Sequence, residues 1–162
     1  TPYLYEKLTA REFMRFVAGL YRLPGGSWES DSEQLLGLFE LAEQADQLIE
    51  SFSHGMRQKL SFASCFLHRP KVVVVDEPWV GLDPKNIRFV RHFLREKTRE
   101  GLTVFMSTHS LSIIEDVADR VGIITHGKLR HTGSLAEIRA LARKPGTLED
   151  VFLELTEGDT AA

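Results

Sequence analysis

The chain has 162 residues, of which 43% are hydrophobic and 27% are charged, a length and composition typical of one globular, soluble domain. Its formal net charge of −3 gives no indication of a basic surface that would bind nucleic acid. Its single cysteine, Cys65, excludes an intrachain disulfide. No apolar run approaches the ~20 residues that a membrane span needs. Because it starts at Thr1 without a signal-peptide pattern, we expect the chain to be a piece of a longer protein.

The first part of the chain is predicted to be helical. Thr9 and Glu12 have the spacing of a capping box, and the amphipathic pattern that follows predicts a helix to about Leu23. Leucine and phenylalanine at helical spacing predict a second helix from Ser32 to Gln44. These helices are expected to pack through their apolar faces.

A third helix is predicted to start near Gly55, with Ser53 as its N-cap. The first turn of a helix has unpaired N–H groups and the positive end of the dipole, and a glycine there has no Cβ to keep an anion away. A plain capped helix accounts for Ser53, but it gives no reason for a glycine that weakens the helix. We therefore favour a phosphate-binding helix start.

Four consecutive valines, Val72 to Val75, predict a strand that is buried on both faces, as in a parallel sheet covered by helices. Asp76 and Glu77 follow at the carboxyl end of this strand, where open α/β sheets bind ligands. Neighbouring residues on a strand point to opposite sides, so we expect different tasks for the two carboxylates. In a nucleoside triphosphatase, the first holds the magnesium shell and the second acts on the attacking water. The alternative is a buried strand that runs into an acidic turn.

The second half alternates helices and strands. A helix is expected from Lys85 to Arg99, then a strand from Thr103 that leads to His109, and later a strand from Val121 to Thr125. This alternation predicts a mainly parallel sheet, with His109 on the same edge as the two carboxylates. A lone histidine is usually structural, but an imidazole at this edge could donate a hydrogen bond to a phosphate oxygen.

Residues 122–128 have the spacing of a phosphate loop, but the Ser or Thr that should come next and the following helix are both missing. His126 and Gly127 are instead predicted to form a hairpin turn. Small helices are expected after the capping residues Ser134 and Thr147, and a frayed tail over 158–162.

Taken together, these stretches resemble the ATP-binding subunit of an ABC transporter. Residues 53–58 resemble the signature motif, 72–77 the Walker B strand, 81–83 the D-loop, and His109 the switch histidine. Met56 and the segment 147–156 are most similar to the bacterial exporters and multidrug-type members. In the family, the Walker A loop, the nucleotide-stacking aromatic residue and the Q-loop come before the part of the domain that this chain resembles from Thr1 onward. None of the three is therefore present in this sequence.

The resemblance implies an α/β fold like that of a P-loop NTPase, with a parallel sheet, helices on both faces and an added helical subdomain. The N-terminal part of this domain would be absent. Residues 1–68 would form the helical subdomain that ends in the signature helix, 69–133 the Walker B and switch part of the ATPase core, and 134–162 the C-terminal helices and tail.

The resemblance also implies ATP binding and Mg²⁺-dependent hydrolysis that drive transport, with export expected. Glu77 would be the general base, Asp76 would hold Mg²⁺ through water, His109 would sense the γ-phosphate, Asp83 in the D-loop would couple two sites, and Ser53, His54, Gly55 and Met56 would contact the ATP of a partner subunit. The partners would be a second ATP-binding subunit, in a homodimer, and a transmembrane permease. The protein would then lie at the cytoplasmic face of the membrane.

Two alternatives remain at this point. A non-transport ABC ATPase that acts on DNA or ribosomes would share these motifs, although the acidic balance of the chain disfavours it. The chain on its own could also be an inert fragment that only self-associates, because it lacks the phosphate loop.

Overall fold

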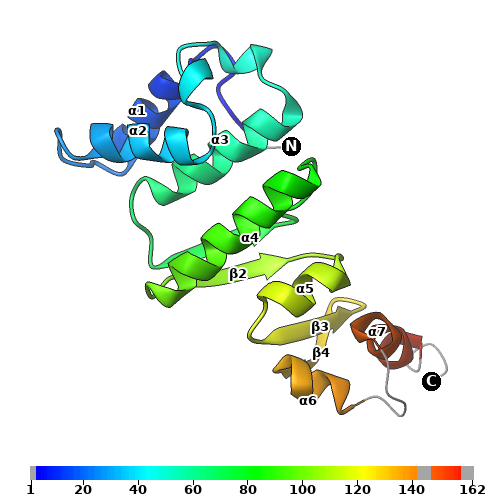
Figure 1. Ribbon diagram of the computed structural model, residues 1–162. Coiled ribbons are helices and arrows are strands. Elements are labelled where there is room, and N and C mark those ends of the chain that lie inside the picture. Colours follow the sequence, from blue (N-terminus) through cyan, green and yellow to red (C-terminus); the bar gives the residue numbers. More distant parts are fainter. Residues whose placement is uncertain (1–2, 142–146, 158–162) are drawn as a thin grey trace. The chain divides into compact units, whose positions relative to one another are not determined.

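The computed structural model describes residues 3–141 and 147–157, so the tail predicted to fray lies outside the described residues. The chain divides into two compact units, Thr1–Met106 and Ser107–Ala162, and each is described by itself (Figure 1). Among the described residues, no helix combines the length and the apolar character that crossing a bilayer requires.

The first unit consists of a helical half followed by a β-α-β segment. In chain order it contains α1 (Ala10–Leu20), α2 (Trp28–Leu38), the 3-10 turns η1 (Ala42–Gln44) and η2 (Ile49–Ser51), α3 (His54–Phe66), β1 (Val72–Asp76), α4 (Pro84–Arg99) and β2 (Thr103–Ser107). β1 and β2 are neighbours in a parallel sheet, and α4 connects them.

α1 begins with the predicted capping box. The N–H of Glu12 donates to Thr9 Oγ1 at 3.1 Å, and the N–H of Thr9 donates to Glu12 Oε2 at 2.8 Å. The helix ends at Leu20, before the predicted Leu23, because Arg22 adopts a left-handed φ of 53°. A residue in this conformation ends the α-helical ladder.

The predicted bounds of the second helix, Ser32 to Gln44, were wrong at both ends, since α2 spans Trp28–Leu38. Glu40 has a φ of 56°, and the N–H of Leu41 donates back to the carbonyl of Leu36 at 2.8 Å. This pairing beside a left-handed residue is the Schellman ending of a helix. The tight turn η1 then replaces the predicted last turn.

The core of the first unit is an aromatic cluster that joins the helical half to α4. Phe39, which is fully buried after α2, meets Phe93 of α4 edge-to-face at 5.3 Å, and Phe66 of α3 meets the same ring at 4.7 Å. Edge-to-face pairs add stability beyond the buried area itself. α2, α3 and α4 are therefore held by shared side chains.

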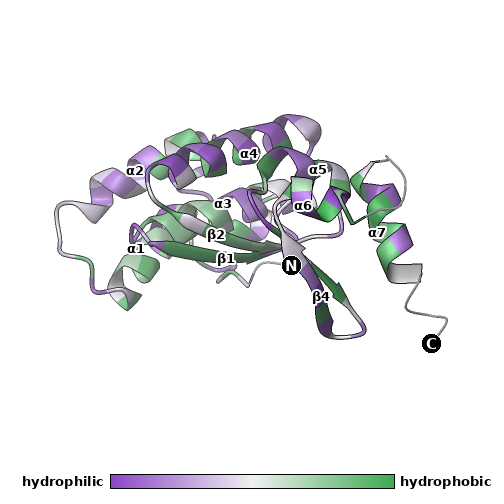
Figure 2. Cartoon of the chain, turned by 90° about the horizontal axis from the view of Figure 1, so that it is seen from below, coloured by the Kyte–Doolittle hydropathy of each residue, from purple (hydrophilic) through white to green (hydrophobic). Residues whose placement is uncertain are grey.

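The prediction that β1 is buried on both faces was wrong for this chain. Val73 is 6% exposed, but Val74 is 72% and Phe105 of the neighbouring strand 67% exposed. In Figure 2, β1 and β2 appear as green, apolar arrows. One side of the sheet is therefore packed, while the other leaves large apolar side chains in contact with water.

The second unit contains α5 (Leu111–Val117), β3 (Val121–Thr125), β4 (Lys128–Gly133), α6 (Leu135–Arg139) and α7 (Leu148–Glu157). The predicted hairpin is confirmed, because β3 and β4 pair antiparallel and His126 and Gly127 both have positive φ at the turn. A parallel sheet is thus described only for β1 and β2. Ile123, Ile138, Leu148 and Val151 form a small core.

Candidate functional site

The start of α3 has the capped geometry that its sequence predicts. Ser53 is extended, with a φ of −62° and a ψ of 163°, and its side chain accepts the N–H of Met56 at 3.2 Å. α3 is described along its whole length, and its first turn carries no acidic side chain. The positive end of the helix dipole is therefore not neutralised within the helix and favours an anion.

Arg57 holds the segment that leads into this helix, a role that sequence reasoning missed. Its guanidinium donates to the carbonyls of Phe52 (3.2 Å) and Glu50 (3.0 Å) and to the carboxylate of Glu6 (2.6 Å). Arginine suits this task because its planar fork of donors can reach several oxygens at once. The signal in the sequence was an arginine one turn after a helix cap.

The connection between β1 and α4 carries the two predicted carboxylates. Asp76 is the exposed last residue of β1, and the half-buried Glu77 has a left-handed φ of 45°. Two tight turns follow, in which Val80 donates to the carbonyl of Glu77 and Leu82 to that of Trp79, each at 3.2 Å. A left-handed non-glycine residue costs on the order of 1–3 kcal/mol, and such residues cluster at functional sites.

Asp83 ends this connection as the N-cap of α4. Its side chain accepts the N–H of Asn86 at 2.9 Å, and this hydrogen bond is the main reason that the pKa of Asp83 is lowered. Pro84 occupies the first position of the helix, where its missing N–H costs nothing. The sequence Asp-Pro is typical of a helix start, but the sequence analysis assigned Asp83 only to the D-loop and did not predict this cap.

Two of the predicted motifs meet in the first unit. A Cβ placed on Gly55 would lie 3.5 Å from the carbonyl oxygen of Gly81, so the start of α3 contacts the turn after Glu77. The ring of His54 lies against Gly81 itself, where a Cβ would be 1.9 Å from the His54 Cδ2 atom. Gly81 has a φ of 81°, a conformation that favours glycine.

His109 belongs to the second unit and is described with its own neighbours. It is exposed and precedes α5, and its carbonyl accepts the N–H of Leu111 at 3.1 Å. The N–H of Ser110 donates to Thr108 Oγ1 at 3.1 Å, which closes the turn before this helix. The imidazole therefore stands on a loop with an ordered hydrogen-bond pattern.

Across residues 3–141 and 147–157, no group of three or more His, Cys, Asp or Glu side chains could hold a metal ion. Mg²⁺ does not require such a group, because it keeps several waters and binds through one or two carboxylates together with substrate phosphates. The exposed carboxylate of Asp76 at the end of β1 fits this kind of donor set.

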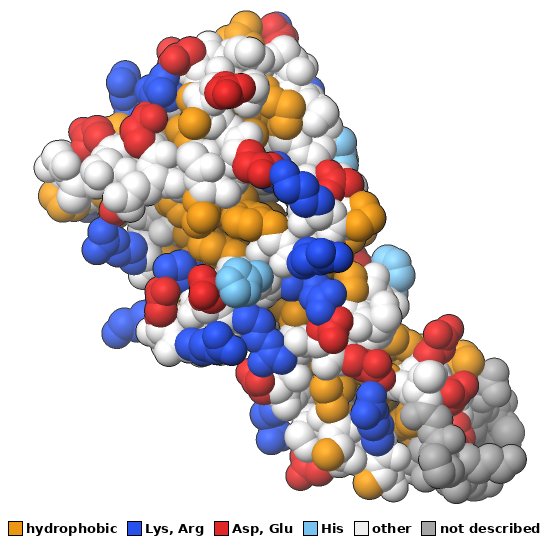
Figure 3. Space-filling view, viewed as in Figure 1, with side chains coloured by type: hydrophobic (Ala, Val, Ile, Leu, Met, Phe, Trp, Pro, Cys, Tyr) orange, Lys and Arg blue, Asp and Glu red, His pale blue; other side chains and the backbone are white. Residues whose placement is uncertain are grey.

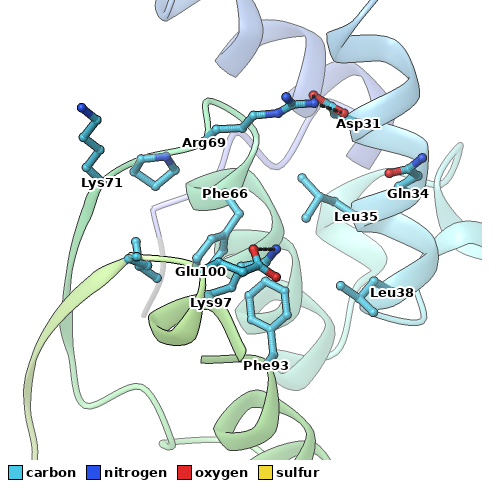
Figure 4. Close-up of a pocket in the computed structure, with 13 residues that line it drawn as sticks. Asp31, Gln34, Leu35, Leu38, Phe66, Arg69, Lys71, Phe93, Lys97 and Glu100 are labelled. Carbon is cyan, nitrogen blue, oxygen red and sulfur yellow. Dashed lines mark hydrogen bonds and ion pairs between the residues drawn. The ribbon is translucent and has the colours of Figure 1, made fainter. Parts of the chain in front are cut away.

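A pocket of about 600 Å³ lies away from these residues. Its floor is apolar, with Leu35 and Leu38 of α2 pointing toward Phe66 and Phe93 (Figure 4). Figure 3 shows hydrophobic side chains gathered in the hollow between α2 and α4. Lys71, which lines the pocket, lies just before the start of β1, whereas Asp76 lies at the opposite end of that strand. None of the predicted site residues lines it, so this pocket is separate from the candidate site.

Comparisons with known proteins support the family resemblance. Residues 12–115 match a family model described as "AAA domain, putative AbiEii toxin, Type IV TA system". The chain is 36% identical over 160 residues to the ABC-type transporter ATP-binding protein EcsA of Bacillus subtilis, which covers 98% of the chain and 65% of EcsA. It is 35% identical over 145 residues to the bacitracin transport ATP-binding protein BcrA of Enterococcus faecalis, over 89% of the chain and 46% of BcrA.

A solved structure of an ATP-binding subunit of an ABC transporter has the same fold. Its TM-score is 0.88 at 33% sequence identity, over 96% of this chain and 65% of the other. The fold class predicted from the sequence is thereby confirmed. The chain spans 65% and 46% of the lengths of the two relatives named above. From its motifs, its fold and these likenesses, the chain belongs to the ATP-binding proteins of ABC transporters.

Proposed function

We propose that the chain is part of an ATPase subunit that binds and hydrolyses ATP with Mg²⁺ to drive transport across a membrane. The observation that carries this proposal is the contact between two motifs in one unit. The capped start of α3, which favours an anion, touches the turn that follows Asp76 and Glu77. This contact joins the helix start that would receive the partner subunit's ATP to the connection that carries the carboxylates of the subunit's own site.

We propose a separate task for each of these residues. Asp76 holds Mg²⁺ through water, and Glu77 takes the proton of the attacking water as general base. His109 donates a hydrogen bond to the γ-phosphate. The segment from Ser53 through His54 and Gly55 to Met56 contacts the ATP of a partner subunit, and Asp83 couples the two sites. Bound ATP would supply the transferred phosphoryl group, and Mg²⁺ held by Asp76 would neutralise the charge on its phosphates.

The proposed partners are a second copy of the subunit and a transmembrane permease, which would place the protein at the cytoplasmic face of the membrane. Export is the proposed direction, since Met56 and residues 147–156 are similar to those of exporters.

The helical half offers exposed aromatic residues on which the permease could dock. Tyr5 is 59% exposed, and its ring meets that of Phe16 edge-to-face at 4.9 Å. The chain on its own is proposed to be inactive, and residues 1–68, 69–133 and 134–162 are kept as its functional divisions.

The test is the Glu77→Gln substitution in the full-length protein. Glutamine keeps the size of the side chain but removes its basicity, so ATP turnover should fall by roughly 10²- to 10⁴-fold while ATP affinity is kept. The closed dimer should then accumulate. Turnover is measured as phosphate release, ATP affinity by titration, and the dimer by light scattering.

Glu43→Gln provides the matched control. Glu43 is exposed on η1 and has no task in the proposed site, so its substitution should leave turnover unchanged. If Glu77→Gln turned over ATP at the parent rate, the role of general base would pass to His109 or to water positioning alone. Loss of turnover in both variants would point to a general defect instead.

A further inference from the structure

The ring of His54, in α3, lies against the backbone of Gly81, in the connection between β1 and α4. Cδ2 and Nε2 of the His54 ring lie 1.9 and 2.2 Å from the place where a Cβ of Gly81 would be. The ring therefore occupies the space that any other residue would need for its side chain. Gly81 also has a φ of 81°, so its backbone conformation and its surroundings both favour glycine.

The position of Gly81 makes this contact relevant to the proposed chemistry. Toward the N-terminus, two turns connect Gly81 to Glu77, the proposed general base, and their hydrogen bonds are accepted by the carbonyls of Trp79 and Glu77. Pro78 and Trp79, within these turns, are buried. On the other side, the chain reaches the N-cap Asp83 almost at once. This connection is short, has two tight turns and is buried in its middle. If Gly81 moves, the movement is therefore transmitted to Glu77 and Asp83 at the two ends of the connection.

We propose that His54 is a positioning residue, whose ring holds the connection from Glu77 to Asp83 against the start of α3 of the same chain. The inference rests on the proposed function, and it changes the task of His54 within it. The ring lies against the protein's own backbone, so His54 acts on the reaction through the placement of Glu77. A phosphate that binds at the start of α3 is thereby linked to the general base of the same subunit.

The experiment is a double-mutant cycle in the full-length protein with His54→Ala, Gly81→Ala and the combined variant. His54→Ala removes the ring, and Gly81→Ala pushes the ring aside, because His54 is an exposed side chain that can rotate away. Both changes abolish the same contact, and Gly81→Ala also strains a backbone that has a φ of 81°. Each single variant should lower ATP turnover by roughly 10- to 10²-fold, the cost of a small misplacement of a catalytic group.

The combined variant should turn over ATP no more slowly than the worse single variant, because the second change has no contact left to remove. His54→Phe keeps a planar ring against Gly81 without the imidazole nitrogens, and it should retain most of the turnover. ATP affinity of the separate subunits should be unchanged in all four variants. These three results together are expected only for a positioning role.

Two outcomes would overturn the inference while leaving the proposed function intact. In the first, the losses in the combined variant multiply, so the two residues act independently. In the second, His54→Phe is as inactive as His54→Ala, so the imidazole nitrogens act on the nucleotide directly. A parent protein that does not hydrolyse ATP would instead overturn the proposed function, and the inference with it.

Discussion

Glu40 binds two lysines from different helices. Its carboxylate accepts Lys59 of α3 at 3.0 Å and Lys85 of α4 at 2.8 Å. The side chain of Lys59 is only 10% exposed, so its ammonium group has little access to water and depends on this partner. Lys85 and then Lys59 hold the pKa of Glu40 below its usual value by hydrogen bonding to the charged form.

This pairing predicts a dependence of stability on pH. A carboxylate whose pKa is lowered by folding stabilises the protein above its unfolded pKa of about 4.3, and it loses this contribution as the pH falls through the folded value. Glu40→Gln should therefore lower the melting temperature at pH 7, with a smaller difference at pH 3. Thermal unfolding of the parent and the variant at both pH values measures it.

Two further variants separate pairing from side-chain packing. Lys59→Met in the Glu40→Gln background should recover stability, because it removes the poorly hydrated charge and keeps most of the apolar stem. Glu43→Gln, on the exposed turn η1, should change stability little at either pH. Equal destabilisation by Glu40→Gln at pH 7 and pH 3 would contradict the electrostatic explanation.

At the scale of elements, helix starts with a side-chain cap could be predicted from the sequence, but the start of α2, which has no such cap, and the ends of α1 and α2 could not. Caps depend on spacing within four residues, so Thr9 with Glu12 and Ser134 with Glu137 gave the correct starts. The ends of α1 and α2 depend on Arg22 and Glu40 adopting a left-handed conformation that is uncommon for these residue types. That choice is made by tertiary packing, which the local sequence does not encode.

The same limit applies to the candidate site. The cap at Ser53 and the order of Asp76 and Glu77 after a strand follow from local patterns, and the structure bears both out. The ring of His54 against Gly81 joins segments on either side of β1, so no local pattern could indicate it. The sequence did point to Gly55, because a glycine in the first turn of a helix is unfavourable without a special reason.

A pair of substitutions at Gly55 tests the start of α3 as a phosphate-binding element. A Cβ at this position meets only the Gly81 carbonyl oxygen at 3.5 Å, an ordinary van der Waals distance, so alanine fits. Gly55→Ala should raise the free energy of unfolding by up to about 1 kcal/mol, because alanine is the better helix former. Gly55→Asp should also fold, since the dipole favours an acidic residue in the first turn.

The two variants should differ in turnover. An aspartate would bring a negative charge to the place where the partner's γ-phosphate is proposed to bind, and like charges repel at close range. Gly55→Asp should therefore abolish hydrolysis while nucleotide binding to the separate subunit survives, and Gly55→Ala should lose less. Melting temperature, ATP binding and turnover are measured on the full-length protein. Normal turnover of Gly55→Asp would mean that α3 has only a capped start.

At the scale of the whole molecule, the exposed face of the β1–β2 sheet is the most unusual feature. Val72, Val74 and Phe105 are 57%, 72% and 67% exposed, although parallel sheets are normally covered on both faces. Monomers seldom expose a continuous apolar face of this kind. The chain by itself is therefore expected to associate with copies of itself through this face.

Light scattering on the 162-residue chain at increasing concentration tests this expectation. The combined variant Val72→Thr and Val74→Thr keeps β-branched side chains, which suit a strand, but makes the face more polar. The double variant should lower the apparent molar mass toward that of a monomer, with little change in melting temperature, because both side chains are more than half exposed.

Val80→Thr is the matched control, since Val80 is 53% exposed but lies outside the strands, and it should leave the association unchanged. A parent chain that is monomeric at every concentration, or a double variant that associates as strongly as the parent, would show that this face does not drive self-association.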